Sequence, residues 1–330
     1  MFSILKDLIN PFNWIKLIKN PRKIKVLYVR LFSYPGINFK NIRLKIFRNL
    51  YKRFSIEFLN FIAKKNKNLN YFFYDNANKQ NFNDIKIKDI TFQLDDNKNI
   101  TDTAFENFQR HGIIVIENVI SEREREKIIK VFNNFSKNKK IINLTKDQKS
   151  IDVNATLFNS SIENFEELFL INSKITKKVF GKEVLAQGQF FIYKTKKLPE
   201  SIHPGDNNLH MDRYLPNLKL IYFPFDVEEN LSPYRYALGS HKINNSYKDF
   251  FLNNDDCVFD DRNKKSENFT KNTIKATVKK NSLALTCTNG FHGRSPFEKH
   301  GERLTLFMTY PNFDLIDLFN YLKINRKNSN

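Results

Sequence analysis

The sequence predicts a mainly β protein with flanking helices and a basic, helix-rich N-terminal extension. Three observations lead to this class. Short apolar strands separated by turn residues recur between residues 184 and 310, without the strand–helix alternation of a parallel sheet. Segments with helix-capping patterns precede them. The first 70 residues carry 16 Lys and Arg against two acidic residues, which accounts for +14 of the net charge of +20.

The N-terminal extension is expected to consist of short helices, because Pro11, Pro21 and Pro35 divide residues 1–70. The clearest helical pattern covers residues 41–64, where aromatic side chains share one stripe and most basic side chains lie off it. Contact with an anionic membrane surface is one interpretation. Packing of the stripe on the body of the protein is the other. Nucleic acid is not expected as a partner, since no binding motif accompanies the charge.

A domain boundary is expected near residue 85, with the extension and a linker at 1–85 and a single domain at 86–330. The polar residues 64–100 contain one expected edge strand. No apolar run reaches the roughly 18 residues of a membrane span, and no secretory signal pattern is present. Two cysteines do not make a disulfide framework. We therefore expect a cytoplasmic protein. If the basic extension contacts an anionic membrane, that surface would be the inner face of the membrane.

Two capped helices and a strand are expected after residue 100. Thr103 and, three residues later, Glu106 match a capping box, and the helix that they open should end near Gly112. Residues 113–120 are mostly apolar and have the length of a strand. A second capping box at residues 121–124 opens another helix. Its core face comprises Ile128, Ile129, Phe132 and Phe135.

The second half of the chain has the pattern of an all-β core. A helix is expected first, over residues 162–179. Strands are then expected at residues 187–194, 210–214, 218–226, 273–278, 282–288 and 303–310. Their shortness and the turn residues between them favour a sandwich or a barrel. Residues 253–272 form a charged loop that is interpreted as either a lid or a surface insertion.

Three residues of this half are candidate metal ligands. His210 and Asp212 share one face of an expected strand, because residues two apart on a strand point the same way. His292 follows another strand, and Gly290 lets the backbone turn tightly before it. Singly, each residue is more often structural. Together they supply two imidazoles and one carboxylate, a set that leaves open positions and suits non-haem Fe(II), a co-substrate and O₂.

Arg303 is the candidate for binding an anionic co-substrate. It begins a strand on which Arg303, Thr305 and Phe307 share a face. If that face is the inner one, a bidentate ion pair with the distal carboxylate of a dicarboxylic co-substrate explains the guanidinium. Thr305 could donate its hydroxyl to the same carboxylate. The alternative for Arg303 is an ion pair with Glu298.

The chain resembles the phytanoyl-CoA dioxygenase family, a branch of the 2-oxoglutarate- and Fe(II)-dependent oxygenases. The resemblance spans roughly residues 100–312 and rests on residues 111–121, 209–214, 229–242 and 290–303. It implies a double-stranded β-helix (jelly-roll or cupin-like) core. It also implies Fe(II) held by His210, Asp212 and His292, with 2-oxoglutarate held at its far carboxylate by Arg303. Gln189 and Tyr193, which share a strand face, are further candidate contacts of the co-substrate.

The reaction implied by the resemblance is hydroxylation of a small-molecule or lipid- or glycan-linked substrate, with release of succinate and CO₂. Related halogenases carry a small residue in place of the ligand carboxylate, so Asp212 favours hydroxylation or another oxidation over halogenation. The chain departs from the family pattern at Leu231, Ser232 and Arg294. The alternative function is a non-catalytic binding protein on the same fold, which would use its basic N-terminus to bind an anionic membrane or another polyanion.

The four remaining histidines are expected to lie outside the metal site. His241 follows a Gly-Ser pair and is interpreted as structural. His203 is interpreted as a surface residue, and the alternative is a position at the entrance of the site. His111 and His300 are expected to be exposed.

Overall fold

A computed structural model describes residues 82, 84–138, 141–145, 148–152, 165–180, 183, 187–194, 209–212, 218–242, 272–296, 298 and 302–310. The basic extension at 1–70 lies outside these residues, as do residues 253–271 of the charged loop. The described part contains no helix that is long and apolar enough to cross a membrane.

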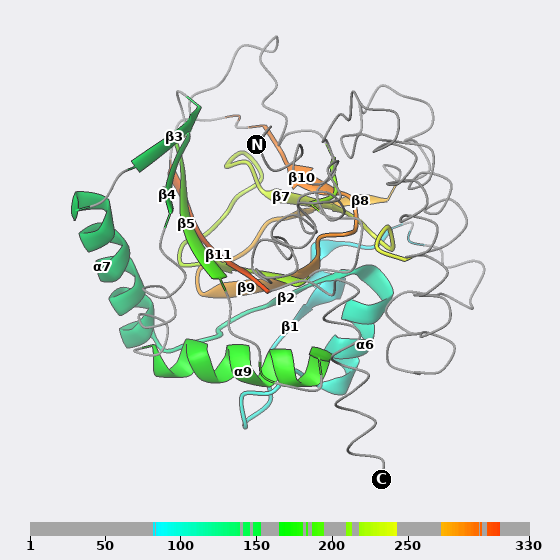
Figure 1. Cartoon of the computed structure of the whole chain (residues 1–330). Helices are drawn as coiled ribbons and strands as arrows, with labels where there is room; N and C mark the ends of the chain where they lie inside the picture. The colour runs from blue at the N-terminus through cyan, green and yellow to red at the C-terminus, as the bar shows by residue number, and fades with distance from the viewer. Residues whose placement is uncertain are drawn as a thin grey trace, which may run out of the picture.

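Two facing β-sheets form the core (Figure 1). The large sheet has the strand order β1-β2-β9-β6-β11-β5-β4-β3. Its strands are β1 (Thr91–Phe92), β2 (Ile113–Ile116), β9 (Ser282–Cys287), β6 (Leu218–Phe223), β11 (Glu302–Thr309), β5 (Gln187–Lys194), β4 (Gln148–Asp152) and β3 (Ile141–Thr145). The small sheet has the order β10-β7-β8 and consists of β10 (His292–Arg294), β7 (Tyr234–Ala237) and β8 (Thr273–Ala276).

The chain passes back and forth between the two sheets. After β5 in the large sheet, His210 forms a bridge to His292 of the small sheet. The chain then runs through β6 in the large sheet, β7 and β8 in the small one, β9 in the large one, β10 in the small one and β11 in the large one. This order is that of a jelly roll. It agrees with the predicted mainly β core, and the predicted edge strand corresponds to β1.

Both faces of the large sheet are covered. On β11, Leu304, Leu306 and Met308 belong to the cluster that packs under the helices, whereas Phe307 packs in the cluster between the sheets. β2 divides in the same way and all four of its residues are buried. Side chains that alternate along a strand therefore pack into two separate core layers, one under the helices and one between the sheets. The inner layer is the one that positions the candidate site.

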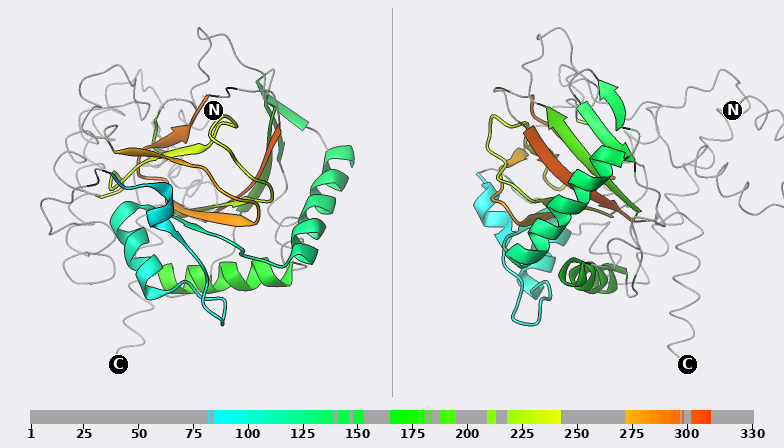
Figure 2. Two further views of the ribbon diagram at one scale, coloured as in Figure 1. Left: turned by 180° about the vertical axis from the view of Figure 1, so that it is seen from behind. Right: turned by 90° about the vertical axis from the view of Figure 1, so that its left-hand side faces the viewer.

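Three helices lie on the outer side of the large sheet, as the two views of Figure 2 show. They are α6 (Asp102–His111), α7 (Glu122–Asn138) and α9 (Glu166–Phe180). A short 3-10 helix, η2 (Ile87–Ile90), precedes β1. The buried side chains of these helices include Phe108, Ile128, Phe132, Leu168, Ile171 and Ile175, and all of them belong to one cluster with the outer face of the sheet.

The N-terminal cap of α6 differs from the prediction. The helix begins at Asp102, and the hydroxyl of Thr101 accepts a hydrogen bond from the Ala104 amide at 3.2 Å. Thr103 lies inside the first turn, so the capping box predicted with Glu106 is wrong. The end of the helix agrees with the prediction, because Gly112 has a φ of 81°, in the left-handed region that favours glycine.

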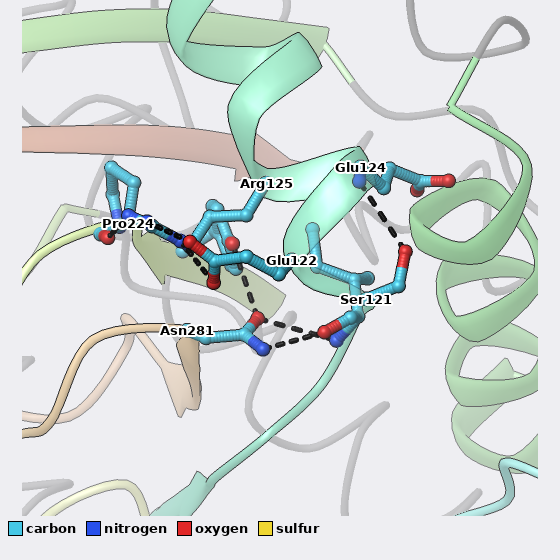
Figure 3. Close-up of polar contacts among 8 residues, drawn as sticks. Ser121, Glu122, Glu124, Arg125, Pro224 and Asn281 are labelled. Carbon is cyan, nitrogen blue, oxygen red and sulfur yellow. Dashed lines mark hydrogen bonds and ion pairs between the residues drawn. The ribbon is translucent and has the colours of Figure 1, made fainter.

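The second capping box is half correct. Ser121 accepts a hydrogen bond from the Glu124 amide at 3.3 Å, as expected and as Figure 3 shows. The Glu124 carboxylate does not return to Ser121. It accepts instead from the amides of Glu167 and Leu168 in the first turn of α9, at 3.0 and 2.6 Å. Glu167 accepts from the Ser121 amide at 2.7 Å. Each helix thus supplies a carboxylate that satisfies amides at or beside the N-terminus of the other.

A polar cluster at the start of α7 joins the helix to two loops of the sheets (Figure 3). Arg125 pairs with Glu122 and donates to the carbonyl of Pro224, just after β6, at 2.7 Å. The Asn281 side chain, from the turn before β9, exchanges hydrogen bonds with the backbone of Ile120 and accepts one from Tyr222. These contacts fix α7 against the ends of β6 and β9.

The structure contains strands that the sequence pattern did not indicate, namely β3, β4, β7 and β10. β10 has only three residues and β7 has four, which is too short for a periodic signal. The strand predicted at 210–214 is represented by the bridge at His210, and residues 213–217 lie outside the described part.

The corrected cap of α6 gives a direct test. Thr101→Ala removes the acceptor of the Ala104 amide and is expected to lower the free energy of unfolding by about 1 kcal/mol. Thr103→Ala changes an exposed side chain within the helix and is expected to change it by less than about 0.5 kcal/mol. Urea unfolding followed by circular dichroism measures both. A larger loss for Thr103→Ala would restore the cap predicted from the sequence.

Candidate metal centre

Backbone hydrogen bonds bring the two halves of the candidate site together. The His210 amide donates to the His292 carbonyl at 2.8 Å, and the His292 amide donates to the His210 carbonyl at 2.9 Å. The Asp212 amide donates to the Thr288 carbonyl at 3.0 Å. The segment at 209–212 is therefore held as a short strand beside β10, and residues 82 positions apart in the sequence become neighbours.

The three predicted ligands converge on one point. Asp212 Oδ1 lies 3.6 Å from His210 Nε2 and 3.4 Å from His292 Nε2. All three ligand atoms lie within 4.8 Å of one another. Ligand atoms on one face of an octahedron with bonds of about 2.1 Å would lie about 3 Å apart, so the set fits one ion after a small closure. His292 is buried, whereas the side chains of His210 and Asp212 are 20% and 28% exposed, which leaves the site open to solvent on one side.

The protonation of His292 follows from its contacts. Its Nδ1 lies 2.9 Å from the Gly290 carbonyl oxygen, which can only accept, so Nδ1 carries the proton and Nε2 presents a lone pair. Burial lowers the pKa of His292 from its ordinary value, although the Asp212 carboxylate opposes this shift. The imidazole is therefore neutral near pH 7, with its lone pair directed at Asp212.

Asp212 is ionised in the same environment. Burial by itself would raise the pKa of Asp212, but the positive charge of the Lys219 ammonium is the largest opposing effect, and this pKa lies well below its ordinary value. A carboxylate oxygen and a neutral imidazole nitrogen, which are both acceptors, thus face each other at 3.4 Å. Among the described residues Nε2 of His292 is buried and has no hydrogen-bond donor. A bound cation would satisfy both atoms.

Arg303 and Thr305 lie on the inner face of β11, as the alternation predicted. Phe307, two residues further along this face, packs in the cluster between the sheets. Arg303 and Thr305 are both buried, whereas Glu298, the alternative partner of Arg303, is exposed. The Thr305 hydroxyl has no hydrogen-bond partner among the described residues. The inner face of β11 therefore offers a guanidinium and a hydroxyl to the space between the sheets.

The strand register places Gln189 and Tyr193 beside the same face. Tyr193 of β5 is directly opposite Arg303 of β11, and Gln189 is directly opposite Phe307. Directly opposed residues of neighbouring strands lie on one face of a sheet. The backbone is thus compatible with the predicted contacts, whose side chains lie outside the described part.

Two residues near the triad were not identified from the sequence. The Tyr234 ring lies 5.5 Å from the His292 ring, and its buried hydroxyl lies 3.3 Å from the Thr286 hydroxyl. Lys219 donates to the second carboxylate oxygen of Asp212. Tyr234 belongs to β7, which gave no strand signal. A signal for Lys219 was present, since it is a single charge within the apolar run of β6.

Two histidines outside the triad are buried. His241 is fully buried and its Nε2 lies 3.0 Å from the Gln109 carbonyl, which confirms the structural interpretation. His111 is 4% exposed, so the prediction of an exposed His111 is wrong. The turn that follows β7 covers it, and the Gly239 amide donates to its carbonyl at 2.9 Å. His203 and His300 lie outside the described residues.

Burial of His111 predicts acid destabilisation. Burial lowers the pKa of His111 from 6.5 to about 4, with smaller effects of Arg110 and Lys242 in the same direction. Between these values the unfolded chain binds a proton that the native state does not bind. The free energy of unfolding should therefore fall as the pH drops from 6.5 to 4, by roughly 2 to 3 kcal/mol from this group.

Urea unfolding at pH 7 and at pH 4.5 measures this dependence. His111→Leu, which cannot titrate, is expected to lose less stability between the two pH values than the wild type does. An equal loss in both proteins would show that other groups cause the acid sensitivity.

No protein-family model and no curated protein matches the chain in sequence. Solved structures similar in fold include the epimerase SnoN with Fe³⁺, 2-oxoglutarate and a nogalamycin compound (TM-score 0.47, 12% identity, 62% of this chain and 81% of that one). HygX from Streptomyces hygroscopicus, with nickel, 2-oxoglutarate and hygromycin B, has a TM-score of 0.46 at 16% identity, over 65% of this chain and 88% of that one. EctD from S. alaskensis with bound Fe has a TM-score of 0.44 at 15% identity, over 66% and 78%.

Proposed function

We propose that the chain is an Fe(II)- and 2-oxoglutarate-dependent dioxygenase that acts on a small molecule. One observation carries the proposal. The Asp212 carboxylate and the neutral His292 imidazole, two acceptors, face each other at 3.4 Å, with His210 completing the set. Two imidazoles and one carboxylate form the facial triad of non-haem iron oxygenases and leave the remaining positions open.

Each residue has a separate task in this proposal. His210, Asp212 and His292 would hold the iron. Arg303 would bind the far carboxylate of 2-oxoglutarate as a bidentate pair, and the Thr305 hydroxyl would donate to the same group. The bound iron and 2-oxoglutarate would supply the oxidising chemistry, with succinate and CO₂ as products. The protein orients the co-substrate and limits the access of water, because Arg303 and Thr305 are buried between the sheets.

Hydroxylation of a small-molecule or lipid- or glycan-linked substrate is the proposed outcome. The presence of Asp212 supports it over halogenation, which uses a site without the ligand carboxylate. Membership of the phytanoyl-CoA dioxygenase family is part of the same proposal and rests on the four stretches between residues 100 and 312.

The basic extension is assigned a peripheral role. We propose that residues 1–85 form an extension and linker that precede the oxygenase domain at 86–330. Residues 1–70 would contact anionic lipid at the inner face of the membrane, in a cytoplasmic protein. Sixteen basic side chains against two acidic ones support this contact. Flotation with vesicles that contain anionic lipid should be lost when residues 1–70 are removed, and equal flotation of both proteins would reject the contact.

Anaerobic titration tests the proposed function. Fe(II) followed by 2-oxoglutarate is expected to give a weak visible charge-transfer band in the wild type and none in His210→Ala. Admission of O₂ should then release succinate from the wild type. A wild type without the band, or a His210→Ala variant with an undiminished band, would reject the dioxygenase and favour a non-catalytic binding protein.

A further inference from the structure

Lys219 is a charged side chain on the inner face of the large sheet. Its neighbours on β6, Leu218 and Leu220, belong to the outer cluster under the helices. Its Cα is directly opposite Thr309 of β11 and Thr286 of β9. Because side chains alternate between the two faces of a strand, the Lys219 side chain points into the space between the sheets. Its side chain is 15% exposed, so little of the ammonium's charge is screened by water.

The ammonium group of Lys219 has two described contacts. It donates to Oδ2 of Asp212, and it lies 5.4 Å from the centre of the Phe307 ring, within the range of a cation–π interaction. Phe307 is on the inner face of β11 together with Arg303. Lys219 thus stands between the candidate metal ligand and the strand that carries the candidate co-substrate residue.

The two oxygens of the Asp212 carboxylate therefore face different groups. Oδ1 faces the Nε2 atoms of His210 and His292, and Oδ2 accepts from Lys219. The Asp212 amide is tied to the Thr288 carbonyl, which fixes the backbone beneath the carboxylate. A carboxylate can bind a metal through one oxygen or through both. In this arrangement only Oδ1 is directed at the metal position.

We propose that Lys219 is a positioning residue that restricts Asp212 to one-oxygen ligation and so preserves the coordination position that a chelating 2-oxo acid needs. The inference rests on the proposed function. Three protein ligands leave three of six octahedral positions open, and 2-oxoglutarate would use two of them. If Asp212 bound through both oxygens, it would occupy one of the open positions. Lys219 prevents this by engaging Oδ2.

The inference predicts a separation between metal affinity and co-substrate affinity. Without Lys219, both oxygens of Asp212 become available to the metal and a nearby positive charge disappears. Metal affinity should therefore be unchanged or higher. Affinity for 2-oxoglutarate should fall by roughly tenfold or more, because the co-substrate would have to displace one oxygen of Asp212 from the metal before it could chelate. A residue that merely supported the fold of the site would affect both affinities.

The test uses the full chain loaded with Co(II), which resists oxidation, under calorimetric titration. Lys219→Met removes the charge and the donor at similar length, and Lys219→Arg keeps both. Lys275→Met is the matched control, because Lys275 pairs with Glu229 on the surface at 2.6 Å. Exposed ion pairs contribute little to stability, so this control should leave both affinities as in the wild type. Lys219→Arg is expected to restore 2-oxoglutarate affinity to within about threefold of the wild type.

Titration with azide separates positioning from simple attraction of anions. Azide needs one coordination position, so its affinity for the Co(II)-loaded Lys219→Met variant should stay within about threefold of the wild type. Equal losses of azide and 2-oxoglutarate would mean that Lys219 acts by charge attraction alone, and would overturn the inference. Unchanged 2-oxoglutarate affinity in Lys219→Met, or joint loss of metal and co-substrate, would also overturn it. A wild type that binds neither Co(II) nor 2-oxoglutarate would overturn the proposed function instead.

Discussion

Replacement of His292 by Ala is expected to lower the affinity for a divalent metal by roughly 100-fold or more. Loss of a residue that only hydrogen-bonds to a metal ligand typically lowers metal affinity about 10- to 100-fold, and loss of the ligand itself should cost more. His292 supplies a neutral, buried Nε2 whose lone pair is fixed by the bond from Nδ1 to the Gly290 carbonyl. Only His210 and Asp212 would remain. Calorimetric titration of the metal-free protein with Co(II) measures the loss.

His241→Gln is the matched control for this substitution. His241 is also a buried histidine, but its ring contacts the Gln109 carbonyl and it lies outside the triad. A glutamine amide can still donate to that carbonyl, so this variant should keep the metal affinity of the wild type. If His292→Ala bound Co(II) as tightly as the wild type while His241→Gln did not, the assignment of the metal ligands would be wrong.

Replacement of Arg303 by Leu is expected to lower the affinity for 2-oxoglutarate by about 100-fold and to leave metal affinity unchanged. The guanidinium is buried on the inner face of β11, and removing one partner of a buried ion pair costs about 3 kcal/mol or more, which corresponds to roughly 150-fold. Titration of 2-oxoglutarate into the Co(II)-loaded protein gives both affinities.

A co-substrate without the distal carboxylate sharpens this test. 2-Oxobutanoate keeps the chelating end of 2-oxoglutarate but has no group for Arg303 to bind. The wild type should prefer 2-oxoglutarate strongly, and the preference should nearly disappear in Arg303→Leu. Lys in place of Arg303 keeps the charge but loses the bidentate geometry, so an intermediate preference is expected. A preference that survives in Arg303→Leu would place the distal carboxylate elsewhere.

Much of the site could be predicted from the sequence because strand geometry is local. A period of two residues puts His210 and Asp212 on one face and puts Arg303, Thr305 and Phe307 on another, whatever the rest of the chain does. The structure places Phe307 in the inner core and His210 beside His292, in agreement with that reasoning. Local pattern also located the end of α6, where Gly112 has a positive φ.

Other features could not be predicted because distant segments decide them. Thr101 and Thr103 are two residues apart, and both are residue types that cap helices. The structure begins α6 after Thr101, and Ala104 and Phe108 of this helix pack on the core. His111 appeared exposed at the end of a helix, yet the turn after β7 covers it. β7 and β10 are too short to have a periodic signal and exist because each pairs with a neighbouring strand.

By itself, the sequence determined which residue types can form the site and which of them share a strand face. The tertiary structure alone decided the distances. The bridge between His210 and His292 places Nε2 of His292 3.4 Å from Oδ1 of Asp212. The second oxygen of Asp212 accepts a hydrogen bond from Lys219. The reason is physical: the side-chain period of a strand is a property of adjacent peptide units. The approach of two strands depends on hydrogen bonds and packing between segments that lie far apart in the chain.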